Sequence, residues 1–197
     1  MRHSDLTALV MHVRPYRETS AMVQFFSREQ GRIVGVMKGV RRGRNPVAVQ
    51  PFCYGRLTCS GRSGLMTVTQ FDVLGRYTLT GDSLSAGFYV LELLSRVLAE
   101  QQVEPRIFFA AERVLATLQA LSVPANADIA RGLRMFETTM LSELGYGFDY
   151  DYDATTGDPV EAEGWYRWEA EHGFCSASGG DNKKFEGWML KALSEYD

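Results

Sequence analysis

The sequence predicts an α+β protein: a small barrel of five strands, then a bundle of amphipathic helices, then a small acidic segment rich in turns. Three observations lead to this prediction. Short stretches of alternating polarity fill residues 1–80, apolar residues then recur every three or four positions, and the remainder changes again to turns and carboxylates. The apolar content of 45% and the charged content of 23% are typical of globular chains, which argues against disorder.

Five candidate strands precede residue 80. The segment Gly61-Arg62-Ser63-Gly64 is a good hairpin turn between the last two, and none of the five has a helical period. The candidates are residues 8–13, 19–26, 32–38, 52–60 and 65–77. An OB-fold barrel has this size and this number of strands. Residues 1–80 are therefore predicted to form an OB-fold domain.

Residues 81–147 are predicted to form three antiparallel helices. Asp82 is expected to cap the first helix, Pro105 to open the second, and Gly145 to end the third, while Pro124 separates the last two. Glu92 and Arg96 form an i,i+4 pair on the first helix. The apolar positions that should face the core are Leu84, Phe88, Leu91, Leu94, Leu98, Phe108, Ala111, Leu115, Leu118, Ile129, Leu133, Phe136, Met140 and Leu144.

The rest of the chain is predicted to contain a small subdomain and a short helix. Residues 148–180 are rich in turn residues and carboxylates, and residues 165–169 can pair with residues 174–176 as a hairpin. Residues 181–197 are interpreted as the start of a C-terminal helix that is cut short, and the apolar positions of this helix begin at Phe185.

An aspartate run in this subdomain resembles the start of a calcium loop. Asp149, Asp151 and Asp153 have the required spacing. The sixth position of such a loop needs glycine and the twelfth needs glutamate, but the sequence has Ala154 and Val160 there. We interpret the run as a solvated loop that holds no metal.

Charge divides the chain into a basic and an acidic part. Residues 1–76 carry 12 Lys or Arg and 4 Asp or Glu, whereas residues 77–197 carry 9 and 20. Eleven of the twelve basic residues are arginine, which suits phosphate, and residues 38–46 form a basic loop between strands. We therefore predict that residues 1–80 bind nucleic acid. The alternative is that the barrel binds an acidic protein. The candidate DNA-binding residues are Arg14, Arg17, Lys38, Arg41, Arg42, Arg44, Arg56 and Arg62.

The sequence contains no pattern that indicates catalysis, a cofactor or a membrane. It has no phosphate-binding loop, no nucleophile elbow and no pair of CxxC motifs, so we expect a binding protein rather than an enzyme. No apolar run approaches the roughly 18 residues of a membrane helix, and no secretion signal is recognised. Three cysteines cannot all pair within one chain, which favours a reducing cytoplasm.

Several segments, taken in order, resemble the RecO family of bacterial recombination mediators. They are residues 9–26, the Gly31-Arg32 turn, residues 38–41 and residues 50–52 in the first domain. In the helical region they are residues 86–98, and residues 134–137 leading to residues 144–147. Each motif alone is weak, and their joint order from about residue 9 to residue 193 is what makes the resemblance specific.

The resemblance implies an OB-fold, a helical domain and a small zinc-finger-like subdomain. It implies binding of single- and double-stranded DNA, annealing of complementary strands, and contact with the acidic C-terminal tail of the single-stranded DNA-binding protein. It also implies that the protein, a monomer on its own, works with RecR to load the RecA recombinase at the bacterial nucleoid in the cytoplasm. None of these steps needs catalysis.

Two details of the resemblance concern particular residues. Many family members hold zinc with two CxxC pairs, and the matching positions here are Asp153, Thr156, Cys175 and Ser178, so a single thiol is left and no zinc is expected. For the acidic tail, Arg131 and Arg134 lie three residues apart on the third helix, next to its apolar stripe. These two arginines are the predicted partner-binding residues, and the alternative is that Arg134 only pairs with Glu137 on the helix surface.

Overall fold

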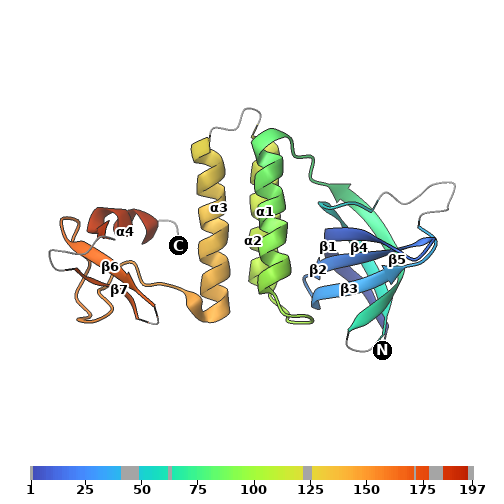
Figure 1. Cartoon of the computed structure of the whole chain (residues 1–197), viewed down its shortest axis with the longest axis horizontal. Helices are drawn as coiled ribbons and strands as arrows, with labels where there is room; N and C mark the ends of the chain where they lie inside the picture. Colours follow the sequence, from blue (N-terminus) through green and yellow to red (C-terminus); the bar gives the residue numbers. More distant parts are fainter. Residues whose placement is uncertain are drawn as a thin grey trace. The chain divides into compact units, whose positions relative to one another are not determined.

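Five strands form a closed barrel at the N-terminus of the computed structural model (Figure 1). The structure describes residues 2–40, 49–61, 64–121, 126–170, 172–177 and 184–194. The strands are β1 (Arg2–Tyr16), β2 (Ser20–Ser27), β3 (Gly31–Met37), β4 (Cys53–Ser60) and β5 (Leu65–Arg76). Their order around the barrel is β1-β2-β3-β5-β4, and every pairing is antiparallel except β3 with β5. This is the barrel of an OB-fold, as the sequence predicted.

The alternation of apolar residues explains the barrel, because alternate side chains of a strand point to the same face. Val10, Val23 and Leu57 come from three different strands, and all three are fully buried in the barrel core. The rings of Phe25 and Phe71 meet there with 5.1 Å between their centroids. The predicted strands agree with the observed ones, although β1 begins earlier than the sequence indicated.

Three helices follow the barrel, and successive helices run in opposite directions (Figure 1). They are α1 (Gly81–Val97), α2 (Pro105–Ala120) and α3 (Asn126–Leu141). Pro105 opens α2 as predicted, because a proline in the first turn has no need of its missing N–H. After α3 the backbone makes one wider turn, Ser142–Tyr146, in which Gly145 has a φ of 83°. None of the helices in the described ranges is long and apolar enough to cross a membrane.

The barrel and the helices share a packed junction. The Phe26 and Phe108 rings lie 5.3 Å apart, and the Arg32 Nε donates a hydrogen bond to the Leu98 carbonyl at 2.9 Å. Across the same junction, the Ser95 hydroxyl donates to the Gln24 side chain at 2.9 Å. Consistent with this, residues 1–136 form one compact unit.

Residues 137–197 form a second compact unit. Its sheet has the strand order β7-β6-β8, with β6 (Trp165–Glu169), β7 (Gly173–Ser176) and β8 (Phe185–Glu186), and helix α4 (Gly187–Ser194) follows. The predicted hairpin is confirmed, since β6 pairs antiparallel with β7. Among the described residues of this unit, five form its small buried core: Tyr150, Val160, Tyr166, Phe174 and Leu190.

The structure corrects three details of the sequence analysis. Thr80 is the N-cap of α1, and Asp82 lies inside the first turn, where its charge still favours the helix N-terminus. Phe88 is 49% exposed, because its ring lies at the margin of the junction against Phe52. Phe185 begins a strand before the helix, since it pairs with Tyr166. The predicted break at Pro124 lies outside the described residues.

Candidate nucleic-acid interface and partner pocket

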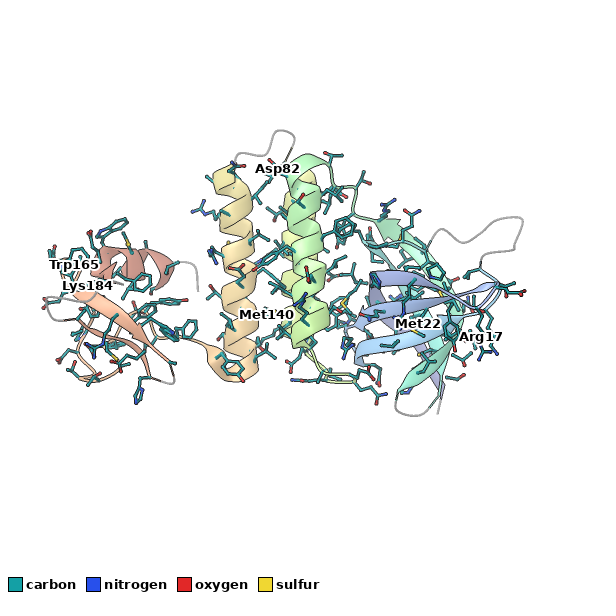
Figure 2. The ribbon with its side chains drawn as sticks, viewed as in Figure 1. Arg17, Met22, Asp82, Met140, Trp165 and Lys184 are labelled. Atoms are coloured by element: carbon teal, nitrogen blue, oxygen red, sulfur yellow. The ribbon has the colours of Figure 1, made fainter. Side chains whose placement is uncertain are left out.

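Strand register brings three of the predicted basic residues to one end of the barrel. Arg14 of β1 lies opposite Met22 of β2, and the β1–β2 turn that follows carries Arg17 (Figure 2). Strand β3 pairs with the other side of β2 and ends there at Met37, which lies opposite Ala21, so Lys38 leaves the barrel at the same end. Arg14, Arg17 and Lys38 are all exposed, and we call them the basic end of the barrel.

Neighbouring side chains hold two of these guanidinium groups against the barrel. The Arg14 Nη2 lies 2.8 Å from the Met22 sulfur, and the Arg17 guanidinium carbon lies 5.2 Å from the centre of the Tyr16 ring. Methionine sulfur is only a weak acceptor, and a stacked guanidinium keeps its N–H groups at its edge. The basic end can therefore present charge-assisted donors to a phosphate.

The remaining predicted DNA-binding residues are not brought to the basic end. Arg56 lies on β4 opposite Thr7, seven residues along β1 from Arg14, where its Nη1 donates to the Thr7 hydroxyl at 3.2 Å. It also forms an ion pair with Asp5 at 3.6 Å. Arg41, Arg42, Arg44 and Arg62 lie outside the described residues.

Two other barrel arginines have structural partners. Arg28 contacts Glu29 at 2.9 Å and lies 6.0 Å from the centre of the Phe109 ring. Arg32 reaches across the junction to the Leu98 carbonyl at 2.9 Å and to Glu100 at 3.8 Å. Some arginines of the N-terminal region therefore form contacts within the protein, and only the remaining positive charge is available at the surface for a polyanion.

A pocket of about 240 Å³ lies between helices α2 and α3. Its apolar wall contains Val114, Met135 and Phe136, and its charged residues are Arg113, Arg131 and Asp128. Of the two predicted partner-binding arginines, the structure places only Arg131 in this pocket. Arg134 is exposed elsewhere on α3. Sequence reasoning missed Arg113, because its position relative to Arg131 depends on how α2 packs against α3.

The aspartate run was predicted to be solvated, and for Asp153 this is wrong. Asp153 is 2% exposed. Its Oδ1 accepts hydrogen bonds from the backbone N–H groups of Thr155 at 2.7 Å and Thr156 at 3.1 Å. Its Oδ2 accepts a hydrogen bond from the Ser176 backbone N–H at 2.7 Å and another from the Ser176 hydroxyl. Burial alone would raise the pKa of Asp153, but hydrogen bonds from Ser176, Thr155 and Thr156 outweigh burial and lower it.

The donors in this region do not fit a zinc ion. A structural zinc site needs four ligands, usually thiolates and imidazoles, whereas the oxygens of Asp153 are already used by N–H and O–H groups. Cys175 is buried, and its thiol faces the Gly173 carbonyl at 3.8 Å. Within the described ranges, no group of three or more histidine, cysteine or acidic residues could hold a metal.

A five-stranded OB-fold barrel joined to a helical bundle, with cations gathered at one barrel end, is the architecture of a nucleic-acid-binding protein. Comparison with protein families agrees: residues 1–77 match the model "Recombination protein O N terminal", and residues 79–194 match "Recombination protein O C terminal". The chain belongs to the RecO family, whose members act in DNA repair and recombination.

Individual relatives show the same similarity. The DNA repair protein RecO of Proteus mirabilis is 37% identical over 191 residues, covering 95% of this chain and 76% of the relative. The RecO proteins of Shigella boydii and Nitrosococcus oceani are each 38% identical, over 190 and 192 residues. These two alignments cover 95% of this chain, and 77% and 76% of the relatives.

Proposed function

We propose that this protein binds single- and double-stranded DNA, anneals complementary strands, and helps to load a recombinase onto DNA covered by the single-stranded DNA-binding protein. The observation that carries the proposal is the basic end of the barrel, formed by Arg14, Arg17 and Lys38. Membership of the RecO family supports it. Such a role would be carried out at the bacterial nucleoid.

The proposed mechanism is electrostatic and requires no bond making or breaking. Arginine and lysine neutralise phosphates and release the counterions condensed on DNA, which favours binding of any sequence. Two strands held on one basic surface repel each other less, so their bases can pair. The basic loop that follows Lys38 would extend this surface, although its arginines lie outside the described residues.

The pocket between α2 and α3 is our candidate for the acidic tail of the single-stranded DNA-binding protein. An acidic peptide with an apolar last residue needs an apolar recess and a cation for its terminal carboxylate. Met135 and Phe136 supply the recess, while Arg131 and Arg113 supply the cations. The planar fork of arginine can bind both carboxylate oxygens. RecR is the second proposed partner.

A salt titration tests the DNA proposal. Changing Arg14, Arg17 and Lys38 together to alanine should weaken binding to oligonucleotides of different sequence to a similar extent. It should also lower the slope of log affinity against log salt by up to about 3, roughly one for each lost phosphate contact. Arg96→Ala removes one cation from α1, where it pairs with Glu92 at 2.6 Å, and should leave the slope unchanged. Binding that is indifferent to salt would instead favour an acidic protein as the ligand of the barrel.

A labelled tail peptide tests the partner pocket. Arg131→Ala should weaken peptide binding by about 1.5–3 kcal/mol, the usual contribution of a hydrogen bond to a charged group. Arg134→Ala, three residues away and outside the pocket, is the matched control and should bind like the wild type. The reverse result would move the site to the exposed face of α3. Equal affinity of all three proteins would show that neither arginine belongs to the peptide-binding site.

A further inference from the structure

The second unit differs sharply in charge from the barrel. Residues 137–197 contain 14 Asp or Glu and only four Lys or Arg, a balance of −10. Several of its aromatic side chains are exposed, among them Trp168 at 40% and Tyr146 at 69%. Neither DNA nor an acidic tail would be attracted to such a surface. An acidic surface with exposed aromatic rings calls for a ligand of positive charge.

These features meet in a pocket of about 200 Å³ that lies wholly within the second unit. Three aromatic residues line it: Tyr146, Phe148 and Trp168. The rest of the lining includes Ala154, His172 and three glycines, and the glycines bring no side chain into the space. The volume is below the roughly 300 Å³ at which pockets for drug-sized ligands begin, and it suits one inserted side chain.

Trp168 is held in place before any ligand arrives. Its ring meets the Phe148 ring edge-on, with 4.3 Å between the centroids and 76° between the planes. The Phe174 ring lies 5.2 Å from it as well, and Phe174 belongs to the buried core of the unit. A fixed aromatic face binds a cation with a smaller loss of conformational entropy than a mobile one.

A carboxylate also lines this pocket. Asp149 accepts hydrogen bonds at its Oδ1 from the backbone N–H groups of Asp151 at 2.9 Å and Tyr152 at 3.2 Å. These bonds fix the side chain. Within the described part of the chain its Oδ2 has no hydrogen-bond partner or ion pair, so one oxygen and the negative charge remain for a ligand.

We propose that this pocket receives an arginine side chain from a basic segment of a partner protein, with the guanidinium against Trp168 and its N–H groups directed to Asp149. Arginine fits better than lysine, because its planar group can stack on an aromatic ring and still donate from its edge. The proposal is independent of the DNA and acidic-tail sites, which require ligands of the opposite charge.

The test uses the full chain and a short fluorescent peptide with three arginines separated by glycine and serine. Binding is measured by anisotropy at low salt, against the same peptide with citrulline, which is neutral and nearly isosteric with arginine. The arginine peptide should bind and the citrulline peptide should not. Trp168→Leu should weaken binding by about threefold to thirtyfold, the range of a cation–π contact.

Asp149→Asn is the sharper variant, because the amide keeps the Oδ1 acceptor for the two backbone N–H groups and removes only the charge. It should weaken binding severalfold. Glu163→Gln removes an equal charge from an exposed position outside the pocket and is the matched control. Equal losses in both variants would mean that only net charge matters, and unchanged affinity in Asp149→Asn would exclude the pocket; either result overturns the proposal. Self-association of the chain through this face, seen by sedimentation, would also overturn it, because the occupant would then be a second copy of this chain.

Discussion

The barrel is built around fifteen buried residues among those described, whereas the sheet of the second unit packs on only five. The barrel also closes on itself, so each strand has a partner on both sides, while the second sheet ends at β7 and at the two residues of β8. The second unit adds a buried carboxylate, Asp153, that ties the turn at residues 153–156 to strand β7. Where a core is too small to hold its elements together, a hydrogen-bonded side chain can link them.

The largest effect should come from removing that carboxylate. Asp153→Ala leaves the N–H groups of Thr155, Thr156 and Ser176 without their acceptor and should destabilise the second unit by about 4 kcal/mol. All three tryptophans of the chain lie in this unit, so thermal unfolding followed by tryptophan fluorescence reports on it alone.

Two further measurements sharpen this result. Asp153→Asn keeps one acceptor oxygen and should lose about half as much stability. A zinc chelator should leave the wild-type transition unchanged, because the donors around Asp153 and Cys175 do not form a zinc site. A chelator-sensitive transition, or one zinc per chain by elemental analysis, would show that the carboxylate is not the only link.

The barrel should instead be sensitive at its junction with the helices. Gly31 has a φ of 67°, and a Cβ there would overlap the backbone of Gln102, so Gly31→Ala should cost about 3 kcal/mol. Gly39 has a φ of 75° but nothing near its Cβ position, so Gly39→Ala should cost only about 1 kcal/mol. Urea unfolding followed by far-UV circular dichroism measures both. Equal costs would mean that backbone conformation alone matters and that the contact with Gln102 does not.

The two units should also lose folding stability at opposite ends of the pH scale. The hydrogen bonds lower the pKa of Asp153 in the native state. Between the native and the unfolded pKa, the carboxyl group is protonated only in the unfolded state, so the free energy of unfolding rises with pH. The contribution is complete above the ordinary value of 3.8 and is lost as the pH falls through the native pKa. Acid titration of tryptophan fluorescence should show this loss, and Asp153→Asn should flatten it.

The smallest expected effect lies at the alkaline end, in the first unit. Burial, with Glu112 and Tyr54 nearby, raises the pKa of Tyr77 from 10 to about 12. The unfolded state therefore loses its proton first, so this contribution is complete below pH 10 and declines as the pH rises toward 12. About 1 kcal/mol is at stake after allowance for solvent. Absorbance at the phenolate band, compared between wild type and Tyr77→Phe, isolates this group; a titration near its ordinary pKa would contradict the shift.

Most of the fold follows from local patterns in the sequence. Alternation marks the strands of the barrel, and the three-to-four spacing marks the helices, because both record which face is buried. Asp153 could not be predicted in this way: it lies in a stretch rich in carboxylates and turn residues, and its main partner, Ser176, is 23 residues away. The same holds for Arg113, since no local pattern indicates that it shares a pocket with Arg131. Strand β8 was missed because two residues carry no periodicity.

The parallel pairing of β3 with β5 has a consequence for the order of folding during synthesis. Val34 cannot pair with Leu65 until the chain between them has been made, and Gly31 cannot pack beside Gln102 until later still. Contacts between distant residues form slowly and leave strand edges exposed meanwhile. The barrel therefore cannot close before β5 has been translated, and its junction with the helices is completed only after α1. A nascent chain paused before β5 would present an open barrel to chaperones and proteases.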